Sequence, residues 1–125
     1  MIKICVSLVE EQADRVIAAM NRAGELGADL LEWRLDITKR AKVEETIHQA
    51  PLPVICTVRS VKQGGRFSGT RDAQLSLLLE AMEGGSSYVD WEFNPGKALP
   101  SHLLKVREQV IVSYHNFDET PAEVD

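Results

Sequence analysis

The chain has 125 residues, of which 44% are hydrophobic and 26% are charged, and its formal net charge is −5. Such a composition is typical of one globular domain, and a mildly acidic chain without a basic run argues against a nucleic-acid or anionic-membrane surface. The absence of an apolar run near the roughly 18–20 residues of a membrane span also excludes a transmembrane protein.

The first expected elements are a strand and a helix. Segment 2–8 is apolar and rich in β-branched residues, which predicts a β-strand. Two glutamates follow it, without the long apolar region of a signal peptide, so we expect a cytoplasmic protein. Segment 10–23 then carries apolar residues at i, i+3, i+4 and i+7, which predicts a helix that ends near Gly24 and Gly27.

Segment 28–36 alternates between apolar and charged side chains, which predicts a second strand with one charged face. That face carries Glu32, Arg34 and Asp36. In an open antiparallel sheet such a face would meet water. Here, however, a helix is expected before this strand in the sequence and another after it, which indicates a parallel sheet.

The rest of the chain continues the same alternation. We expect a weaker helix at 43–49, a strand at 54–59, a glycine-containing loop at 60–70, a helix from Asp72, a strand at 88–93, a short helix near Pro100 and a strand at 110–115. The apolar face of the helix from Asp72 is predicted to comprise Leu75, Leu78, Leu79 and Met82. Strand–helix alternation at this spacing predicts a single domain, residues 1–125, with parallel strands and right-handed crossovers.

Polar residues gather toward the carboxyl ends of these strands. Arg59 is the last residue of the third strand, Asp90 and Glu92 share a face of the fourth, and Ser113 and His115 share a face of the fifth. This is typical of a (β/α) barrel of TIM type or a piece of one, in which inward-facing residues alternate with helix-facing residues and the chemistry lies at the carboxyl rim. A doubly wound sheet is less favoured, because its strands usually read as continuous apolar runs. The alternative to a ligand site is a purely structural network of ion pairs.

The remaining cysteines and histidines point to no metal site. Cys5 and Cys56 lie in apolar strand-like segments without a C-x-x-C spacing, so we expect two buried small hydrophobic residues. His48 and His102 fall on predicted helices, where we expect them to be exposed to solvent.

Several short motifs follow one another in a characteristic order. They are CVSL at 5–8, EWRLD at 32–36, CTVRS at 56–60 with K-x-G-G at 62–65, VDWE at 89–92, and SYHNF with T-P within 113–121. Together they resemble type I 3-dehydroquinate dehydratase, a (β/α)8 barrel enzyme of the shikimate pathway. The resemblance implies a small-molecule substrate, 3-dehydroquinate, which loses water through an imine to a lysine and yields 3-dehydroshikimate. It implies no metal and no diffusible cofactor.

The same resemblance assigns roles to individual residues. His115 is expected to be the general acid–base catalyst, and the substrate-pocket residues are expected to be Glu32, Arg34 and Arg59. Supporting roles are expected for Asp36, Glu92 and Gln63, with Asp90 as a further supporting charge. Gln63 stands where the family has a glutamate that helps to orient the histidine, and an amide cannot stabilise an imidazolium by charge.

The resemblance covers the first half of the family, about five of its eight strands, and the imine lysine would lie on the sixth. None of the six lysines of this chain matches that position. We therefore expect a partial barrel that is inactive alone and that pairs with itself as a homodimer or with a complementary fragment. Two alternatives stay open: a non-catalytic, self-assembling half-barrel or binding module, and another imine-forming barrel enzyme such as an aldolase.

Overall fold

The computed structural model describes residues 2–39 and 41–116. Its strands are β1 (Cys5–Leu8), β2 (Leu30–Arg34), β3 (Val54–Thr57), β4 (Tyr88–Glu92) and β5 (Val110–Ser113). Its α-helices are α1 (Ala13–Glu25), α2 (Val43–His48), α3 (Arg71–Glu83) and α4 (Ser101–Leu104), and two 3₁₀ turns, η1 (Val61–Gln63) and η2 (Arg107–Gln109), complete the elements. The predicted order of strands and helices is confirmed.

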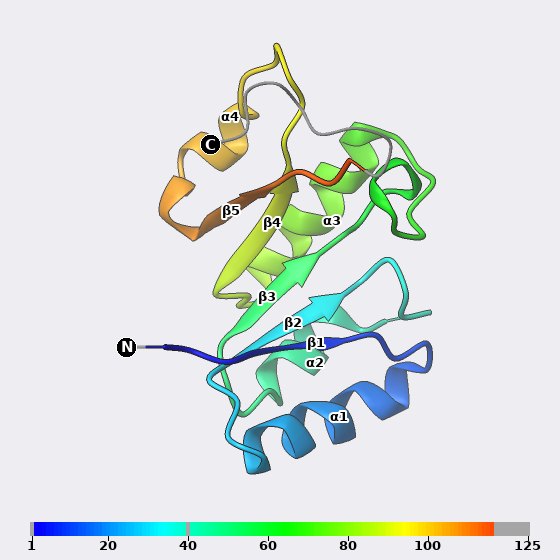
Figure 1. The fold of residues 1–125 in the computed structure, drawn as a ribbon, viewed down its shortest axis with the longest axis vertical. Helices are drawn as coiled ribbons and strands as arrows, with labels where there is room; N and C mark the ends of the chain where they lie inside the picture. Colours follow the sequence, from blue (N-terminus) through cyan, green and yellow to red (C-terminus); the bar gives the residue numbers. More distant parts are fainter. Residues whose placement is uncertain (1, 40, 117–125) are drawn as a thin grey trace.

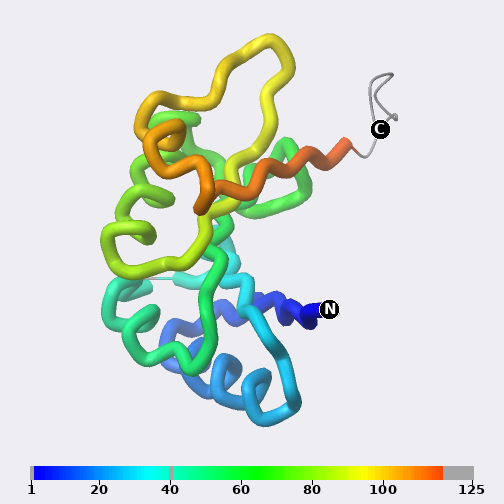
Figure 2. The backbone as a smooth tube through the Cα atoms, turned by 90° about the vertical axis from the view of Figure 1, so that its left-hand side faces the viewer, coloured from blue at the N-terminus to red at the C-terminus, as the bar shows by residue number. Residues whose placement is uncertain are grey.

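All five strands pair in parallel, in the order β1-β2-β3-β4-β5, so each strand lies beside the next one in the sequence (Figure 1). Figure 2 shows the helices gathered on one side of this sheet, while the described residues place no helix on the other side. Strands that advance in sequence order with every crossover on one side are the arrangement of a (β/α) barrel wall. The fold is therefore α/β, a partial barrel of TIM type.

The core lies between the sheet and the helices. From the sheet it takes Leu31 and Trp33 of β2, Cys56 of β3 and Val89 of β4, each fully buried. The helices contribute Val16, Met20, Leu78 and Ala81, also fully buried. Period-2 alternation sends these strand residues toward the helices and their neighbours in the sequence toward the opposite face.

Most element boundaries lie inside the predicted ranges. The first strand begins at Cys5 rather than at residue 2, and the first helix begins at Ala13 rather than at residue 10. The helix starts later because Gln12 forms a parallel bridge with Lys39, and the backbone of Glu11 accepts a hydrogen bond of 2.9 Å from the Lys39 N–H. Extended pairing thus replaces the first helical turn.

The predicted apolar face of α3 packs against the core, with Leu78 fully buried and Leu75, Leu79 and Met82 partly buried, but it is not the most buried face of the helix. Its fully buried positions are Gln74, Leu78 and Ala81, whereas Leu75 and Leu79 are only half-buried. The face is rotated toward Gln74 because this side chain finds hydrogen-bond partners inside the protein, which removes the usual cost of burying an amide.

The prediction for the cysteines was right for Cys56 and wrong for Cys5. Cys56 faces the helices, and its burial raises the pKa of the thiol to about 11. Cys5 is exposed, because it lies on the edge strand β1 and on the same side as Ser7, away from the helices. His48 and His102 are exposed, as expected. In the described part of the chain, no helix has both the length and the apolar character that crossing a membrane requires.

Candidate active site

On the face of the sheet opposite the helices, hydroxyl groups from two strands hold the carboxylate of Glu32. Ser7 of β1 donates a hydrogen bond of 2.7 Å to Glu32 Oε1, and Thr57 of β3 donates one of 2.8 Å to Oε2. The register places both partners beside Glu32, because Ser7 and Glu32 are directly paired and Thr57 lies two residues beyond Ile55, the partner of Glu32. Glu32 is thus fixed on this face between the two neighbouring strands.

Arg34 and Asp36 form a bidentate ion pair at the end of β2. Arg34 Nε donates to Asp36 Oδ1 at 2.9 Å and Nη2 donates to Oδ2 at 2.7 Å. The same carboxylate accepts backbone N–H bonds from Arg59 at 3.1 Å and from Arg66 at 3.0 Å. Burial disfavours the charged form of Asp36, but these four donors outweigh it, so the pKa of Asp36 lies below its ordinary value. Asp36 therefore ties the end of β2 to the loop that follows β3.

Arg59, which follows the central strand β3, is 7% exposed and pairs with polar side chains on the face of the sheet opposite the helices. Its Nη1 donates to Glu92 Oε2 at 3.1 Å and to Ser113 Oγ at 2.8 Å, and its Nη2 pairs with Asp90 Oδ2. Among the described residues, the other oxygen of Asp90, Oδ1, is buried without a hydrogen-bond partner. A buried guanidinium with two carboxylates is held in one orientation, because breaking either contact would leave a charge unpaired.

Glu92 divides its two oxygens between two sets of donors. Oε2 accepts from Arg59 and from the Ser60 N–H at 3.0 Å, and Oε1 accepts from Gln74 Nε2 at 3.0 Å. Burial disfavours the carboxylate, but these hydrogen bonds, beginning with that of Gln74, lower its pKa below the ordinary value. Glu92 thus stays charged and anchors both Arg59 and the start of the following loop.

His115 and Gln63 are brought together at the end of β5. Gln63 Oε1 accepts a hydrogen bond of 3.0 Å from the backbone N–H of His115, so this hydrogen bond is made to the main chain of the histidine. The exposed His115 lines a pocket of about 770 Å³ together with Lys62, Gln63 and Glu92. This volume suits a small metabolite. The T-P pair at 120–121, which formed part of the motif, lies outside the described residues.

The predicted site residues therefore form connected groups. The Arg34–Asp36 pair joins the Arg59–Glu92 pair through the Arg59 N–H, and Glu92 lines the same pocket as His115. Glu32 lies apart from this chain of contacts, between Ser7 and Thr57. Within residues 2–39 and 41–116, no cluster of three or more His, Cys, Asp or Glu side chains could hold a metal ion.

Sequence reasoning missed two residues of this network, Gln74 and Arg71, because both belong to a helix and not to a strand. Gln74 donates to Glu92, and Arg71 donates to the Glu92 carbonyl at 2.9 Å. A signal was present for Gln74, since positions 74, 78 and 81 follow the i, i+4, i+7 spacing of a helix face.

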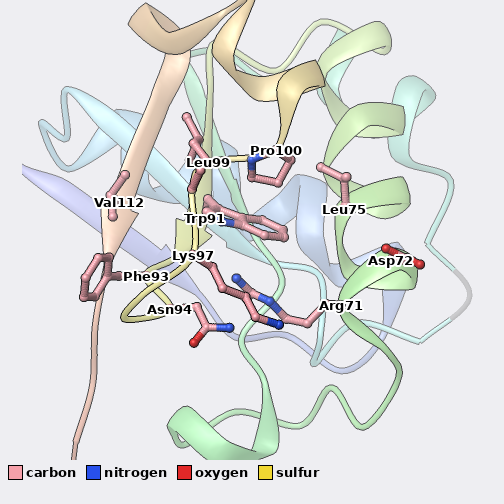
Figure 3. A pocket seen from close by; sticks show the side chains of 11 residues that line it. Arg71, Asp72, Leu75, Trp91, Phe93, Asn94, Lys97, Leu99, Pro100 and Val112 are labelled. Atoms are coloured by element: carbon pink, nitrogen blue, oxygen red, sulfur yellow. The ribbon is translucent and has the colours of Figure 1, made fainter.

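A second, smaller pocket lies on the helix side, between α3, β4 and the segment after β4 (Figure 3). Its volume is about 340 Å³, and the guanidinium of Arg71 stacks over the Trp91 ring at 3.9 Å from the centroid. Phe93 and Val112, which are exposed, form part of its wall. This pocket shares Arg71, Phe93 and Asn94 with the larger one, and His115 does not line it.

Comparisons with known proteins show the same family throughout. The family model for type I 3-dehydroquinase matches residues 4–125. The 3-dehydroquinate dehydratase of Methanothermobacter thermautotrophicus is 38% identical over 123 residues, which are 96% of this chain and 55% of that protein. The 3-dehydroquinate dehydratase of Methanocaldococcus jannaschii is 32% identical, and the match covers 96% of this chain and 56% of that protein.

A solved structure agrees with these matches. The 3-dehydroquinate dehydratase of Geobacillus kaustophilus superposes with a TM-score of 0.73 at 27% identity, and the match covers 95% of this chain and 52% of that one. The chain therefore spans about half the length of the relatives that it matches.

Proposed function

Because the chain belongs to the type I 3-dehydroquinate dehydratase family, we propose that it supplies the substrate-binding and acid–base half of an enzyme that dehydrates 3-dehydroquinate to 3-dehydroshikimate through a lysine imine. The observation that carries this proposal is the buried Arg59, which donates to Glu92 in the wall of the pocket that contains His115. Arg59 and His115 both follow the carboxyl ends of parallel strands. A carboxylated keto-alcohol needs fixed cationic donors for its oxygens and a group that moves protons.

His115 is proposed as the acid–base catalyst, because an iminium acidifies the neighbouring C–H and an imidazole can take that proton and assist departure of the hydroxyl group. Its exposure leaves the ring accessible to a ligand in the pocket. Arg34 and Arg59 are proposed to bind substrate oxygens. The Arg34 pair with Asp36 engages Nε and Nη2, which leaves Nη1 outside that pair, and 19% of this side chain is exposed.

The proposal favours an enzyme over the two alternatives. A non-catalytic half-barrel would explain the Arg59 ion pairs, but the family match extends from residue 4 to residue 125 and includes every strand that carries a predicted site residue. The same match argues against an aldolase. The ion pairs of Arg59 then serve to orient the guanidinium at the site.

The covalent step is proposed to come from the strands that complete the barrel, because this chain covers 55% of its Methanothermobacter relative and none of its lysines matches the imine position of the family. Those strands are supplied either by the same polypeptide or by a second one. Lys62 is the lysine to test against this view, because it lines the pocket that contains His115.

The test is an assay of 3-dehydroquinate dehydration by the 125-residue chain alone and after assembly with a polypeptide that supplies the remaining strands. We expect turnover only after assembly, and none from the 125-residue chain by itself. Borohydride trapping followed by intact-mass analysis is expected to find no adduct on the isolated chain, with Lys62→Met as the control. A stoichiometric adduct that disappears in Lys62→Met would transfer the covalent role to Lys62 and contradict the proposal.

The proposal extends to assembly and location. The edge strand β5 and the residue before β1 present apolar side chains to solvent, with Val112 at 55% and Ile4 at 56% exposure, and unprotected edges favour pairing with another chain. We therefore expect the 125-residue chain to form a homodimer or to bind a complementary fragment, in a cytoplasmic setting. Light scattering coupled to size exclusion checks the assembly, and a monodisperse monomer that melts cooperatively would contradict it.

A further inference from the structure

We propose that Gln74 is a positioning residue for Arg59 that acts through Glu92. Gln74 lies on α3, in the helix layer, and its side chain reaches the carboxyl ends of β3 and β4. The inference rests on the proposed function, because it concerns the guanidinium that binds substrate oxygens there. A residue of helix α3 would thus contribute to a site whose other residues lie on strands and on the loops that follow them.

The amide of Gln74 has a single orientation that satisfies its surroundings. Nε2 donates to the Val58 carbonyl at 2.7 Å and to Glu92 Oε1 at 3.0 Å, and Oε1 accepts from Arg71 Nη1 at 3.0 Å. Exchanging the nitrogen and oxygen would set an oxygen against two acceptors and an NH₂ against a donor. Because the residue is 1% exposed, water cannot replace these bonds.

Arg71 holds the other side of this amide. Arg71 and Trp91 lie next to each other in the pocket of Figure 3. The Arg71 guanidinium stacks on the Trp91 ring at 3.9 Å from the centroid, and it also donates to the Glu92 carbonyl at 2.9 Å. These contacts fix Arg71 while it donates to Gln74 Oε1. The Gln74 NH₂ group is thereby left pointing at Glu92.

Gln74 also separates two cations that compete for the same carboxylate. Arg71 Nη1 lies 3.9 Å from Glu92 Oε1, whereas Arg59 Nη1 lies 3.1 Å from Oε2. Without the amide, Oε1 would be buried with Arg71 as its nearest donor, and the carboxylate would turn toward Arg71. Arg59 and the Ser60 N–H, which share Oε2, would then lose their common anchor.

Two substitutions separate positioning from simple packing. Gln74→Met keeps a side chain of similar length and removes every hydrogen bond. Gln74→Glu keeps the shape, and its protonated form can still donate to Glu92, whereas its ionised form places two carboxylates in contact. The charged groups that face this site are Arg71 on α3, Arg59 after β3, and Asp90 and Glu92 on β4.

The experiment measures KM and kcat of the assembled barrel between about pH 5 and 8 for both variants. For Gln74→Met we expect KM to rise about tenfold at every pH with kcat within about threefold, because a bond to a charged group is lost from the binding machinery. For Gln74→Glu we expect a KM near that of the unaltered protein at low pH and a rise as the new carboxylic acid ionises. Identical pH profiles for the two variants, or a loss confined to kcat, would overturn the inference.

The matched control is Gln109→Met. Gln109 Nε2 also donates to a backbone carbonyl, that of Ser87 at 3.3 Å, and among the described residues it has no hydrogen bond to a carboxylate. We expect its KM and pH profile to be unchanged. An equal rise of KM in Gln109→Met would attribute the effect of Gln74 to general loosening of the fold.

Carboxyl-carbon NMR of Glu92 in the same assembly distinguishes failure of this inference from failure of the proposed function. Loss of the Gln74 donor is expected to move the titration midpoint of Glu92 upward, whether or not the assembly turns over substrate. An unchanged midpoint in an active assembly overturns the inference alone. If the titration midpoint of Glu92 rises but the assembly does not dehydrate 3-dehydroquinate, the proposed function is overturned. The positioning of Glu92 by Gln74 then still holds.

Discussion

The central strands and the last strand of this sheet differ in how completely their side chains are buried. In Figure 1, β5 lies at one edge of the sheet, and β2, β3 and β4 each lie between two strands. On β2, β3 and β4, the helix-facing Trp33, Cys56 and Val89 are fully buried. On β5, Ile111 is 39% exposed and Val112 is 55% exposed. A central strand has two strand neighbours and a helix against one face, whereas an edge strand has one neighbour.

The residues that are proposed to act on the substrate follow the same division. Arg59, which is proposed to bind substrate, is held by Asp90, Glu92 and Ser113. His115, which is proposed to move protons, is exposed and is held through its backbone by Gln63. The guanidinium that is proposed to bind substrate is therefore held in place by contacts within this chain, whereas the proposed acid–base group depends more on what covers the pocket. The following predictions test this difference.

The largest effect is expected for His115→Ala in the assembled barrel. Loss of general acid–base catalysis typically lowers the rate by about 10²–10⁴-fold, and steady-state kinetics would show a fall in kcat of this size. Because the side chain is exposed, the melting temperature should stay unchanged. Unaltered turnover would remove the histidine from the mechanism.

A strong effect on stability is expected for Arg59→Met. Removing the guanidinium leaves Asp90 and Glu92 buried near each other without their shared cation, and breaking such a pair costs about 3–5 kcal/mol of unfolding free energy. Urea denaturation measures the loss. The control is Arg22→Met, which breaks an exposed pair with Glu25 and should cost less than about 1 kcal/mol. Equal losses would contradict the division between centre and surface.

An intermediate effect is expected from pH. The pKa values of Asp36 and Glu92 are lower in the folded protein than their ordinary values, which are about 3.9 for Asp and 4.3 for Glu. The stability that both carboxylates contribute is therefore fully present above these ordinary values and is lost as the pH falls through the lower, folded-state values. Between about pH 6 and pH 3, the urea midpoint of the Asp36→Asn variant should fall less steeply than that of the unaltered protein. Parallel curves of urea midpoint against pH for the two proteins would contradict this account.

The smallest effect is expected for Gln63→Glu. A carboxylate oxygen can accept the same bond from the His115 N–H, so the position of the histidine should be retained. The added charge favours the imidazolium, so kcat should be preserved or raised, by no more than about threefold because this substitution keeps the existing hydrogen bond. A fall in kcat of tenfold or more would show that the amide is needed in its own right.

The amino-acid sequence by itself was enough to predict the order of the elements and which strand residues share a face. Alternation along residues 30–34 separates Leu31 and Trp33 from Glu32 and Arg34, and the structure shows the first two buried against the helices. This could be predicted because the period of a strand is a local property, set by successive peptide units. The family likewise followed from motifs that are contiguous in the sequence, and the comparisons confirm it.

Contacts between distant residues were decided by the tertiary structure alone. The Arg59–Ser113 bond joins positions 54 residues apart, and the Gln63–His115 bond joins positions 52 apart. Whether such groups meet depends on strand register and on how each helix crosses back over the sheet, which no local pattern specifies. For the same reason, a helix residue such as Gln74 joins a site of strand residues. Cys5 likewise lies exposed because it is on the edge strand β1 and faces away from the helices, whereas Leu8 of the same strand is buried.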